Sequence, residues 1–234
     1  MKNKITAIIT AAGQSRRMKS SVNKLLIKVK GVPLLAYTIA CFQKNKYIDE
    51  IIITSSKDSI KKYKEIVKKN KFSKVTKIIQ GGATRFKSVY NALKEASGAG
   101  YVLIHDGARP LISQEVLNRT ILALKKYKAV MAGVAPKDTI KEVNGKLFIN
   151  KTIDRDKIYL AQTPQAFKTS LILEAYGKAP RAGKGITDDA RTAEVLGVKV
   201  KIVEGSYENI KITTPEDLII AEAILRNRGV LCTK

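Results

Sequence analysis

The sequence predicts a doubly wound α/β fold with a mostly parallel sheet. The first indication is a set of short apolar runs, such as IIIT at residues 51–54 and VLI at 102–104, which lack apolar–polar alternation. Strands that are buried on both faces have this pattern. The second indication is that amphipathic stretches of helix length separate these runs, giving a βαβ order. Together they indicate a Rossmann-like architecture.

The elements follow one another along the chain in this alternating order. We expect strands at residues 5–10, 50–55, 74–80, 101–104, 129–135 and 199–204, and helices at residues 33–45, 59–70, 84–96, 113–126 and 215–228. Pro33 suits a first helical position. Ser113 and Thr214 precede acidic residues, as helix-capping residues do. In such a sheet, ligands bind outside the carboxyl ends of the strands.

One segment, residues 138–155, departs from this order. It contains Asn144-Gly145 between two β-prone runs, which is the strongest short-range pattern for a β-hairpin. We expect a β-arm at about 137–156 that protrudes from a single domain spanning residues 1–234. Because a lone hairpin is marginally stable in water, the arm should pack on its own domain or on a second subunit.

Composition limits the class of protein. The chain has 234 residues, of which 44% are hydrophobic, and it has no run long enough to span a membrane. The apolar N-terminal run is interpreted as a first strand and not as a targeting segment. Cys41 and Cys232 have no metal-ligand spacing and predict no disulfide framework. We therefore expect a cytoplasmic protein.

The net charge of +24 arises from 44 Lys and Arg against 20 Asp and Glu. Such a charge is common in nucleic-acid-binding proteins. The basic residues are scattered, however, and no aromatic RNA-binding pattern accompanies them. We therefore expect no nucleic-acid partner, although the charge should attract polyphosphate substrates.

The segment after the first strand, AAGQSRRMKSSVNK at residues 11–24, predicts a phosphate site. Its small residues allow a ligand to approach the backbone, and its basic residues can neutralise phosphates. The small residues are Ala11, Ala12 and Gly13, and the basic ones are Arg16, Arg17 and Lys24. A plain strand-to-helix turn with exposed basic residues is the alternative.

Two more strand ends carry candidate ligand-binding groups. Gly81-Gly82 precedes Arg85 and Ser88, where the glycines would let backbone groups meet a base or ribose; the alternative is a plain βα turn. After residues 101–104, Asp106 suits a divalent cation that is itself bound to phosphates. Arg109 offers a fork for another phosphate.

His105, the only histidine, is interpreted as structural, and it leaves no zinc site or nucleophilic triad. Residues 162–167 are interpreted as a polar turn, and Thr187-Asp188-Asp189 as a helix N-terminus. Lys211 precedes the last helix and should reach the same cleft. Many cations, one candidate metal carboxylate and no general base favour phosphoryl-type chemistry through positioning and electrostatics.

With these motifs in view, the sequence resembles the 2-C-methyl-D-erythritol 4-phosphate cytidylyltransferases of the non-mevalonate isoprenoid pathway. The resemblance covers nearly the whole chain and is carried by AAGQSRRM with Lys24, GGATRFKSV, HDGARP, TIDRDKIYLAQTPQAF, TDDA and ENIKITTPEDL. It implies Mg²⁺-dependent transfer of CMP from CTP to a sugar-alcohol phosphate, with release of pyrophosphate. It also implies a homodimer built through the β-arm.

The resemblance implies a role for each site residue. Arg17 and Lys24 would be catalytic, stabilising charge on the α-phosphate and the leaving pyrophosphate. The sugar phosphate would be held by Arg109, Lys211, Thr139 and Arg155, the last two from the partner's arm. Asp106 would lie near the metal and the ribose. The nucleotide site as we assign it comprises Ala11, Ala12, Gly13, Gly82, Arg85, Ser88, Asp106 and Thr163.

Two positions depart from the family pattern. The chain has Ala83 where an acidic residue is common, which removes one contact to the nucleotide, and Gly107 where alanine is usual. Two alternative functions stay open at this point. One is cytidylyl transfer to ribitol 5-phosphate, although those enzymes tend to begin AGGxGTRM and to read HDAVRP. The other is a non-catalytic, basic nucleotide- or RNA-binding protein.

Overall fold

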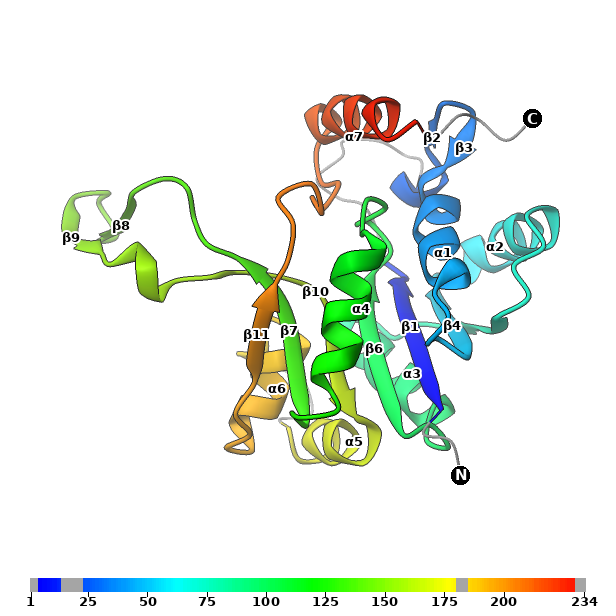
Figure 1. The fold of residues 1–234 in the computed structure, drawn as a ribbon, viewed down its shortest axis with the longest axis horizontal. Helices are drawn as coiled ribbons and strands as arrows, with labels where there is room; N and C mark the ends of the chain where they lie inside the picture. Colours follow the sequence, from blue (N-terminus) through cyan, green and yellow to red (C-terminus); the bar gives the residue numbers. More distant parts are fainter. Residues whose placement is uncertain (1–3, 14–22, 180–184, 230–234) are drawn as a thin grey trace.

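The computed structural model describes residues 4–13, 23–179 and 185–229. Its centre is a seven-stranded sheet with the order β11-β7-β10-β6-β1-β4-β5 (Figure 1). Neighbouring strands are parallel except around β10, which is antiparallel to both β6 and β7. This confirms the predicted mostly parallel sheet. The strands are β1 (Ile5–Ala11), β4 (Glu50–Ser55), β5 (Val75–Gln80), β6 (Tyr101–Asp106), β7 (Ala129–Val134), β10 (Leu160–Lys168) and β11 (Lys201–Glu204).

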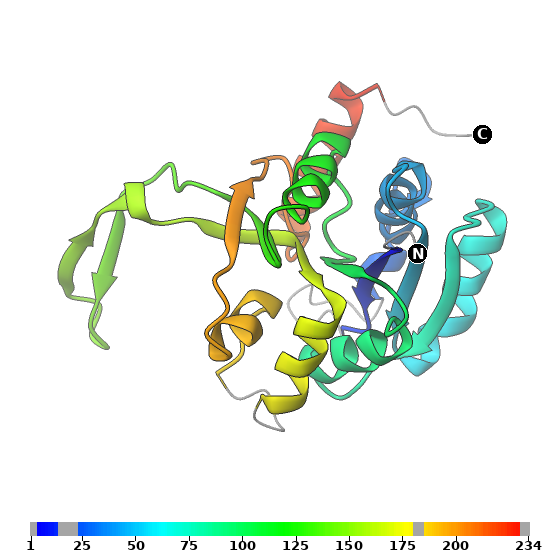
Figure 2. The same ribbon diagram turned by 60° about the horizontal axis from the view of Figure 1, so that its bottom comes forward.

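Helices cover both faces of this sheet (Figure 2). Alternate residues of β1 point to opposite faces: Ala7 and Ile9 belong to one core cluster and Ile8 to the other. On the first face lie α1 (Leu34–Lys44), α2 (Ile60–Lys69) and α4 (Gln114–Ala123). On the second lie α3 (Arg85–Glu95), α5 (Thr169–Lys178) and α6 (Asp189–Val195). The unalternating apolar runs are thus strands buried on both faces, as predicted.

The last helix, α7 (Pro215–Asn227), brings the end of the chain to the carboxyl end of the sheet (Figure 1). It begins with a capping box between Thr214 and Asp217. Its buried side chains Ala221 and Leu225 pack with Ile212 and Leu34 in a third cluster. This packing fixes the loop before α7 beside the start of α1. No helix in the described ranges is long and apolar enough to cross a membrane.

Short elements complete the description. Strands β2 (Lys28–Val29) and β3 (Val32–Pro33) form a small separate pair, and the 3-10 helices are η2 (Lys24–Leu26), η3 (Lys57–Ser59) and η4 (Arg155–Lys157). The prediction that Pro33 is the first helical residue is wrong: it ends β3 and is the N-cap of α1. The other predicted helices are present with ends one to three residues shorter, except that α7 begins at Pro215 as predicted.

The interpretation of residues 162–167 as a polar turn is also wrong, because they lie within β10. Their polar side chains are buried: Gln162 is 7%, Thr163 4% and Gln165 1% exposed. The register of the pairing with β7 shifts between Ala161 and Gln165, and the Thr163–Pro164 bond in this stretch is cis. The irregular backbone is therefore part of a central strand.

The predicted arm is present as the pair β8 (Ile140–Val143) and β9 (Ile149–Ile153), which projects away from the sheet (Figure 1). Its turn is longer than Asn144-Gly145 alone, since the backbone N–H of Asn144 donates to the carbonyl of Phe148. The positive φ in this turn falls at Leu147. The arm carries large exposed apolar side chains, with Leu147 81% and Phe148 68% exposed.

Candidate active site

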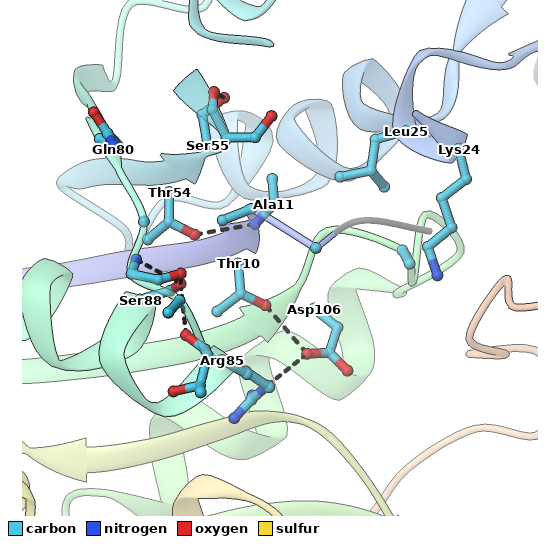
Figure 3. Close-up of a pocket in the computed structure, with 18 of the residues that line it drawn as sticks. Thr10, Ala11, Lys24, Leu25, Thr54, Ser55, Gln80, Arg85, Ser88 and Asp106 are labelled. Carbon is cyan, nitrogen blue, oxygen red and sulfur yellow. Dashed lines mark hydrogen bonds and ion pairs between the residues drawn. The ribbon is translucent and has the colours of Figure 1, made fainter. Parts of the chain in front are cut away.

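A cavity of about 710 Å³ opens at the carboxyl ends of β1, β4, β5 and β6 (Figure 3). This is where a doubly wound sheet is expected to bind its ligand. Nine of the predicted site residues line it: Ala11, Ala12, Gly13, Lys24, Gly82, Arg85, Ser88, Asp106 and Lys211. The segments predicted at the ends of three strands therefore meet in one place.

The end of β1 forms one wall of the cavity. The backbone N–H of Ala11 donates to Thr54 Oγ1 (3.1 Å), and its carbonyl accepts from the Tyr63 hydroxyl (3.0 Å). These bonds fix the backbone of the small-residue segment for which the sequence predicts a phosphate site. The predicted catalytic Arg17, with Arg16, lies outside the described residues.

Lys24, the first residue of η2, lines the cavity (Figure 3). Asn23 caps η2 by accepting from the backbone N–H of Leu25 (3.0 Å), while its amide donates to Tyr63 (2.8 Å). Lys24 Nζ donates to the carbonyl of Ile212 (2.8 Å) in the loop before α7. The two chain segments that carry Lys24 and Lys211 are therefore joined at the cavity.

The glycine pair after β5 packs against the protein instead of leaving open space. A Cβ on Gly81 would lie 2.5 Å from the Cβ of Ala12 and 2.7 Å from Ser88 Oγ. A Cβ on Gly82 would meet the side chain of Lys87. The Gly82 N–H donates to Ser88 Oγ (3.0 Å), and Ser88 in turn donates to the carbonyl of Thr84 (2.9 Å). The glycines hold the cavity wall and the start of α3 together.

We expect Gly81→Ala to shift this wall, because the new methyl group has no room beside Ala12 and Ser88. Overpacking of this kind costs about 1–3 kcal/mol of stability. The expected result is a lower free energy of unfolding in urea and, by calorimetry, weaker binding of CTP, the nucleotide that the sequence resemblance implies. Gly98→Ala is the matched control, since a Cβ there meets nothing within 4 Å. Equal behaviour of the two variants would contradict this packing.

Asp106 is the electrostatic centre of the site. Its Oδ1 accepts from Thr10 Oγ1 (3.2 Å) and Arg85 Nε (3.3 Å), and its Oδ2 accepts from Lys211 Nζ (2.7 Å). Burial alone would raise the pKa of this carboxyl, but Arg85 and Lys211 hold that pKa far below its usual range. Asp106 is therefore ionised at neutral pH.

His105 is structural, as predicted. It is fully buried, its Nε2 lies 3.0 Å from the carbonyl of Arg109, and its Nδ1 lies 3.0 Å from Thr163 Oγ1. Its ring packs at 5.0 Å from that of Phe42. Burial lowers the pKa of His105 to about 4, which leaves a neutral ring at pH 7.

The remaining predicted residues do not line this cavity. Thr163 Oγ1 instead accepts from the backbone N–H of Asp106 (3.1 Å), and Arg109 is mostly buried, with Nη1 donating to the carbonyl of Asn209 (2.6 Å). Thr139 and Arg155 lie at the base of the arm, where Arg155 Nη1 donates to the carbonyl of Lys137 (2.8 Å). Within one chain, neither of these two residues lines the cavity that contains Asp106.

The end of β4 and the segment after it also line the cavity, which the motif search missed. These residues are Thr54, Ser55, Ser56 and Lys57. The strand itself was predicted, and the parallel pairing of β4 with β1 brings its carboxyl end to the same edge. Gln80 and Thr213 were missed as well.

Asp106 is the only carboxylate that lines the cavity in the described part of the chain. Those residues contain no group of three or more His, Cys, Asp or Glu side chains able to hold a metal ion. The cavity lining thus combines one carboxylate with the cationic side chains of Lys24, Lys57, Arg85 and Lys211. Such a set can bind and polarise phosphates but provides no separate general base.

Comparison with known proteins identifies the same family that the sequence motifs resemble. Residues 5–227 match the family model described as IspD, 2-C-methyl-D-erythritol 4-phosphate cytidylyltransferase. Proteins of that name from Clostridium acetobutylicum and Bacillus cereus are 47% and 44% identical; the alignments cover 96% and 94% of this chain and 98% and 97% of the relatives.

Solved structures agree with the sequence comparison. The 4-diphosphocytidyl-2C-methyl-D-erythritol synthase of Anaerococcus prevotii aligns with a TM-score of 0.83 at 38% identity, covering 96% of each chain. The 2-C-methyl-D-erythritol 4-phosphate cytidylyltransferase of Thermus thermophilus aligns with a TM-score of 0.78 at 31% identity, covering 95% of this chain and 99% of the other. The chain belongs to the 2-C-methyl-D-erythritol 4-phosphate cytidylyltransferase family.

Proposed function

We propose that this protein transfers CMP from CTP to 2-C-methyl-D-erythritol 4-phosphate, giving 4-diphosphocytidyl-2-C-methyl-D-erythritol and pyrophosphate. The observation that supports this most directly is the cavity lined by Lys24, Arg85 and Lys211 around the single carboxylate of Asp106. Family membership supplies the identity of the two substrates.

The chemistry fits a site without a general base. A phosphate oxygen of the acceptor attacks the α-phosphorus of CTP, and the bond from that phosphorus to the β-phosphate oxygen breaks. The nucleophile is already an anion at neutral pH, so no proton has to be removed. The barrier then includes repulsion between two anions, which fixed cations at the reacting centre reduce.

Each site residue has a proposed role in this step. Lys24, with Arg17, stabilises the charge on the α-phosphate and the leaving pyrophosphate. Lys211 and Arg109 hold the acceptor phosphate, and Asp106 lies near the metal and the ribose. The nucleotide lies against Ala11, Ala12, Gly13, Gly82 and Ser88, and Arg85 and Thr163 both contact Asp106.

We propose Mg²⁺ as the metal. Magnesium in nucleotide enzymes is commonly held by one or two carboxylates together with substrate phosphates, and Asp106, a carboxylate on the wall of the cavity, fits that donor set. When bound, the ion supplies charge neutralisation at the phosphates. Asp106 already accepts from Thr10, Arg85 and Lys211, which keep its carboxylate ionised and fixed in position.

We also propose a homodimer in which the arm of one subunit completes the cavity of the other. Thr139 and Arg155 do not line the cavity of their own chain. The arm between them exposes Leu147, Phe148 and Ile149, the last 62% exposed, and a partner surface would bury these side chains.

We further propose that residues 1–234 form one nucleotidyltransferase domain with the arm at about 137–156. We also propose that the enzyme works in the cytoplasm and that nucleic acid is not a partner.

The test is pyrophosphate release from CTP and Mg²⁺, with 2-C-methyl-D-erythritol 4-phosphate and ribitol 5-phosphate as parallel acceptors. Release with the first acceptor alone is the expected result. Release with the second alone would assign the enzyme to ribitol phosphate instead. A folded sample that binds CTP but releases pyrophosphate with neither would be a nucleotide-binding protein.

A further inference from the structure

The cavity wall contains an ion-pair network that extends beyond the residues assigned to substrates. Arg85, at the start of α3, directs its guanidinium to two carboxylates. Its Nε lies 3.3 Å from Asp106 Oδ1, whereas Nη1 and Nη2 lie 2.9 and 2.7 Å from the two carboxylate oxygens of Asp189. Two of its three nitrogens therefore face away from Asp106, toward α6.

Asp189 is a fully buried carboxylate with 0% of its side chain exposed. It also accepts from the Tyr176 hydroxyl (2.5 Å). Tyr176 stacks on Phe86 and Tyr90 of α3, with ring centroids 4.5 and 5.9 Å apart. Asp189 is thus held by α5, and the same tyrosine packs on the helix that carries Arg85.

The start of α6 is fixed independently from the sheet. Gln165 of β10 accepts from the backbone N–H of Ala190 (2.7 Å) and donates to Asp188 Oδ2 (2.8 Å). Asp188 caps the helix by accepting from the backbone N–H of Arg191 (2.8 Å). The position of Asp189 is therefore determined by several rigid elements before Arg85 contacts it.

A paired carboxylate grips a guanidinium in one plane, because the two parallel N–H groups must meet the two oxygens. The plane that Asp189 sets points the remaining Nε–H at Asp106. Without Asp189, Arg85 would be free to turn its whole fork onto Asp106 or onto a bound phosphate. The Arg85 side chain is 31% exposed, so room for this movement exists on the cavity side.

A buried ion pair is weak evidence for stability, since apolar replacements of similar volume are often as stable. Stability alone therefore does not explain why Arg85 links Asp189 to Asp106. We propose that Asp189 is a positioning residue of the active site, which acts through Arg85 to fix the orientation of the Asp106 carboxylate toward the nucleotide. The inference rests on the proposed role of Asp106.

The test compares Asp189→Asn, Arg85→Gln and the double variant. An asparagine keeps the size of Asp189, but its single amide oxygen cannot pair with both guanidinium N–H groups of Arg85 as the two carboxylate oxygens do. Loss of a group that orients a ligand-binding residue commonly costs about 10- to 100-fold in activity or metal affinity. We expect a loss of that size in kcat/KM and in CTP affinity for each single variant, and a higher Mg²⁺ concentration for half-maximal activity. The double variant should be no worse than Arg85→Gln alone.

The matched control is Glu194→Gln, which neutralises an exposed carboxylate of the same helix that pairs with Arg191 and not with Arg85. Because Glu194 does not line the cavity, this variant should keep wild-type kinetics. Losses that add in the double variant, or thermal destabilisation of Asp189→Asn with unchanged kinetic constants per folded enzyme, would overturn the proposal. Arg85→Gln alters the partly exposed end of the pair, so the KM-against-kcat pattern is obtained even where Asp189→Asn does not fold.

CTP affinity, measured by calorimetry, separates this proposal from the proposed function. A wild-type enzyme that binds CTP without turning over either acceptor would refute the assigned reaction. In that case, coupling between Asp189 and Arg85 in CTP and Mg²⁺ binding would still support the positioning role, and its absence would overturn it.

Discussion

Lys24→Ala is expected to lower kcat about 10²- to 10³-fold, which is the usual cost of removing one preorganised donor from a developing charge. CTP binding should change much less. Lys24 lines the cavity and is held by the carbonyl of Ile212, so its ammonium is positioned before substrate arrives. A charge that grows only in the transition state gains most from such a group, and this gain appears in kcat.

Steady-state pyrophosphate release gives kcat for the Lys24 variant, and calorimetry gives its CTP dissociation constant. Lys28→Ala is the matched control, because Lys28 is exposed on β2 four residues further along and does not line the cavity. It removes the same charge from the same segment and should leave both constants near wild type. An unchanged kcat for Lys24→Ala would exclude this lysine from a role in the transition state, and weaker CTP binding with that unchanged kcat would make it a ground-state ligand.

The parallel part of the fold could be predicted because burial on both faces leaves a local pattern. In the run IIIT of β4, Ile51 and Ile53 pack on one face and Ile52 on the other. Side chains on both faces of the strand are buried in the core, so the sequence shows a nearly continuous run of apolar residues. The parallel pairing of these strands then follows from their alternation with helices.

The antiparallel strand β10 could not be predicted in this way. Its buried polar groups form hydrogen bonds with residues that are distant in the sequence, so no local pattern marks the strand. Thr163 accepts from the backbone of Asp106 and its carbonyl accepts from Asn209; Gln165 pairs with residues at the start of α6. Buried polar groups of this kind are hydrogen-bonded, and the partners lie far away in the sequence. Locally, the segment has the polarity of a turn and contains a proline.

The candidate site shows the same division. Gly81, Lys24 and Asp106 were predictable because each follows a strand that the pattern identifies. The pairing of Arg85 with Asp189, 104 residues away, was not, because Asp189 resembles an ordinary first-turn acidic residue of a helix. Only the packing of α6 against α5 in the fold reveals that its carboxylate faces Arg85.

Arg155→Ala is expected to raise the KM for 2-C-methyl-D-erythritol 4-phosphate about 10- to 100-fold, the usual contribution of a hydrogen bond to a charged group. CTP affinity should stay unchanged, because the proposed partner of Arg155 is the acceptor phosphate. Lys157→Ala is the control: Lys157 lies two residues away, is 83% exposed and pairs only with Asp154 among the described residues. A fall in CTP affinity would contradict the arm assignment.

Whether Arg155 acts across a dimer can be decided by combining it with Lys24. In a two-fold dimer whose arms are exchanged, a heterodimer of a Lys24→Ala subunit and an Arg155→Ala subunit has one site with both changes and one with neither. Two different affinity tags on co-expressed subunits allow this heterodimer to be isolated. At acceptor concentrations well below the raised KM, it should regain about half of the wild-type activity although both parent homodimers are nearly inactive. If each arm served its own subunit, every site would carry one defect, and the heterodimer would show only the mean of its parents.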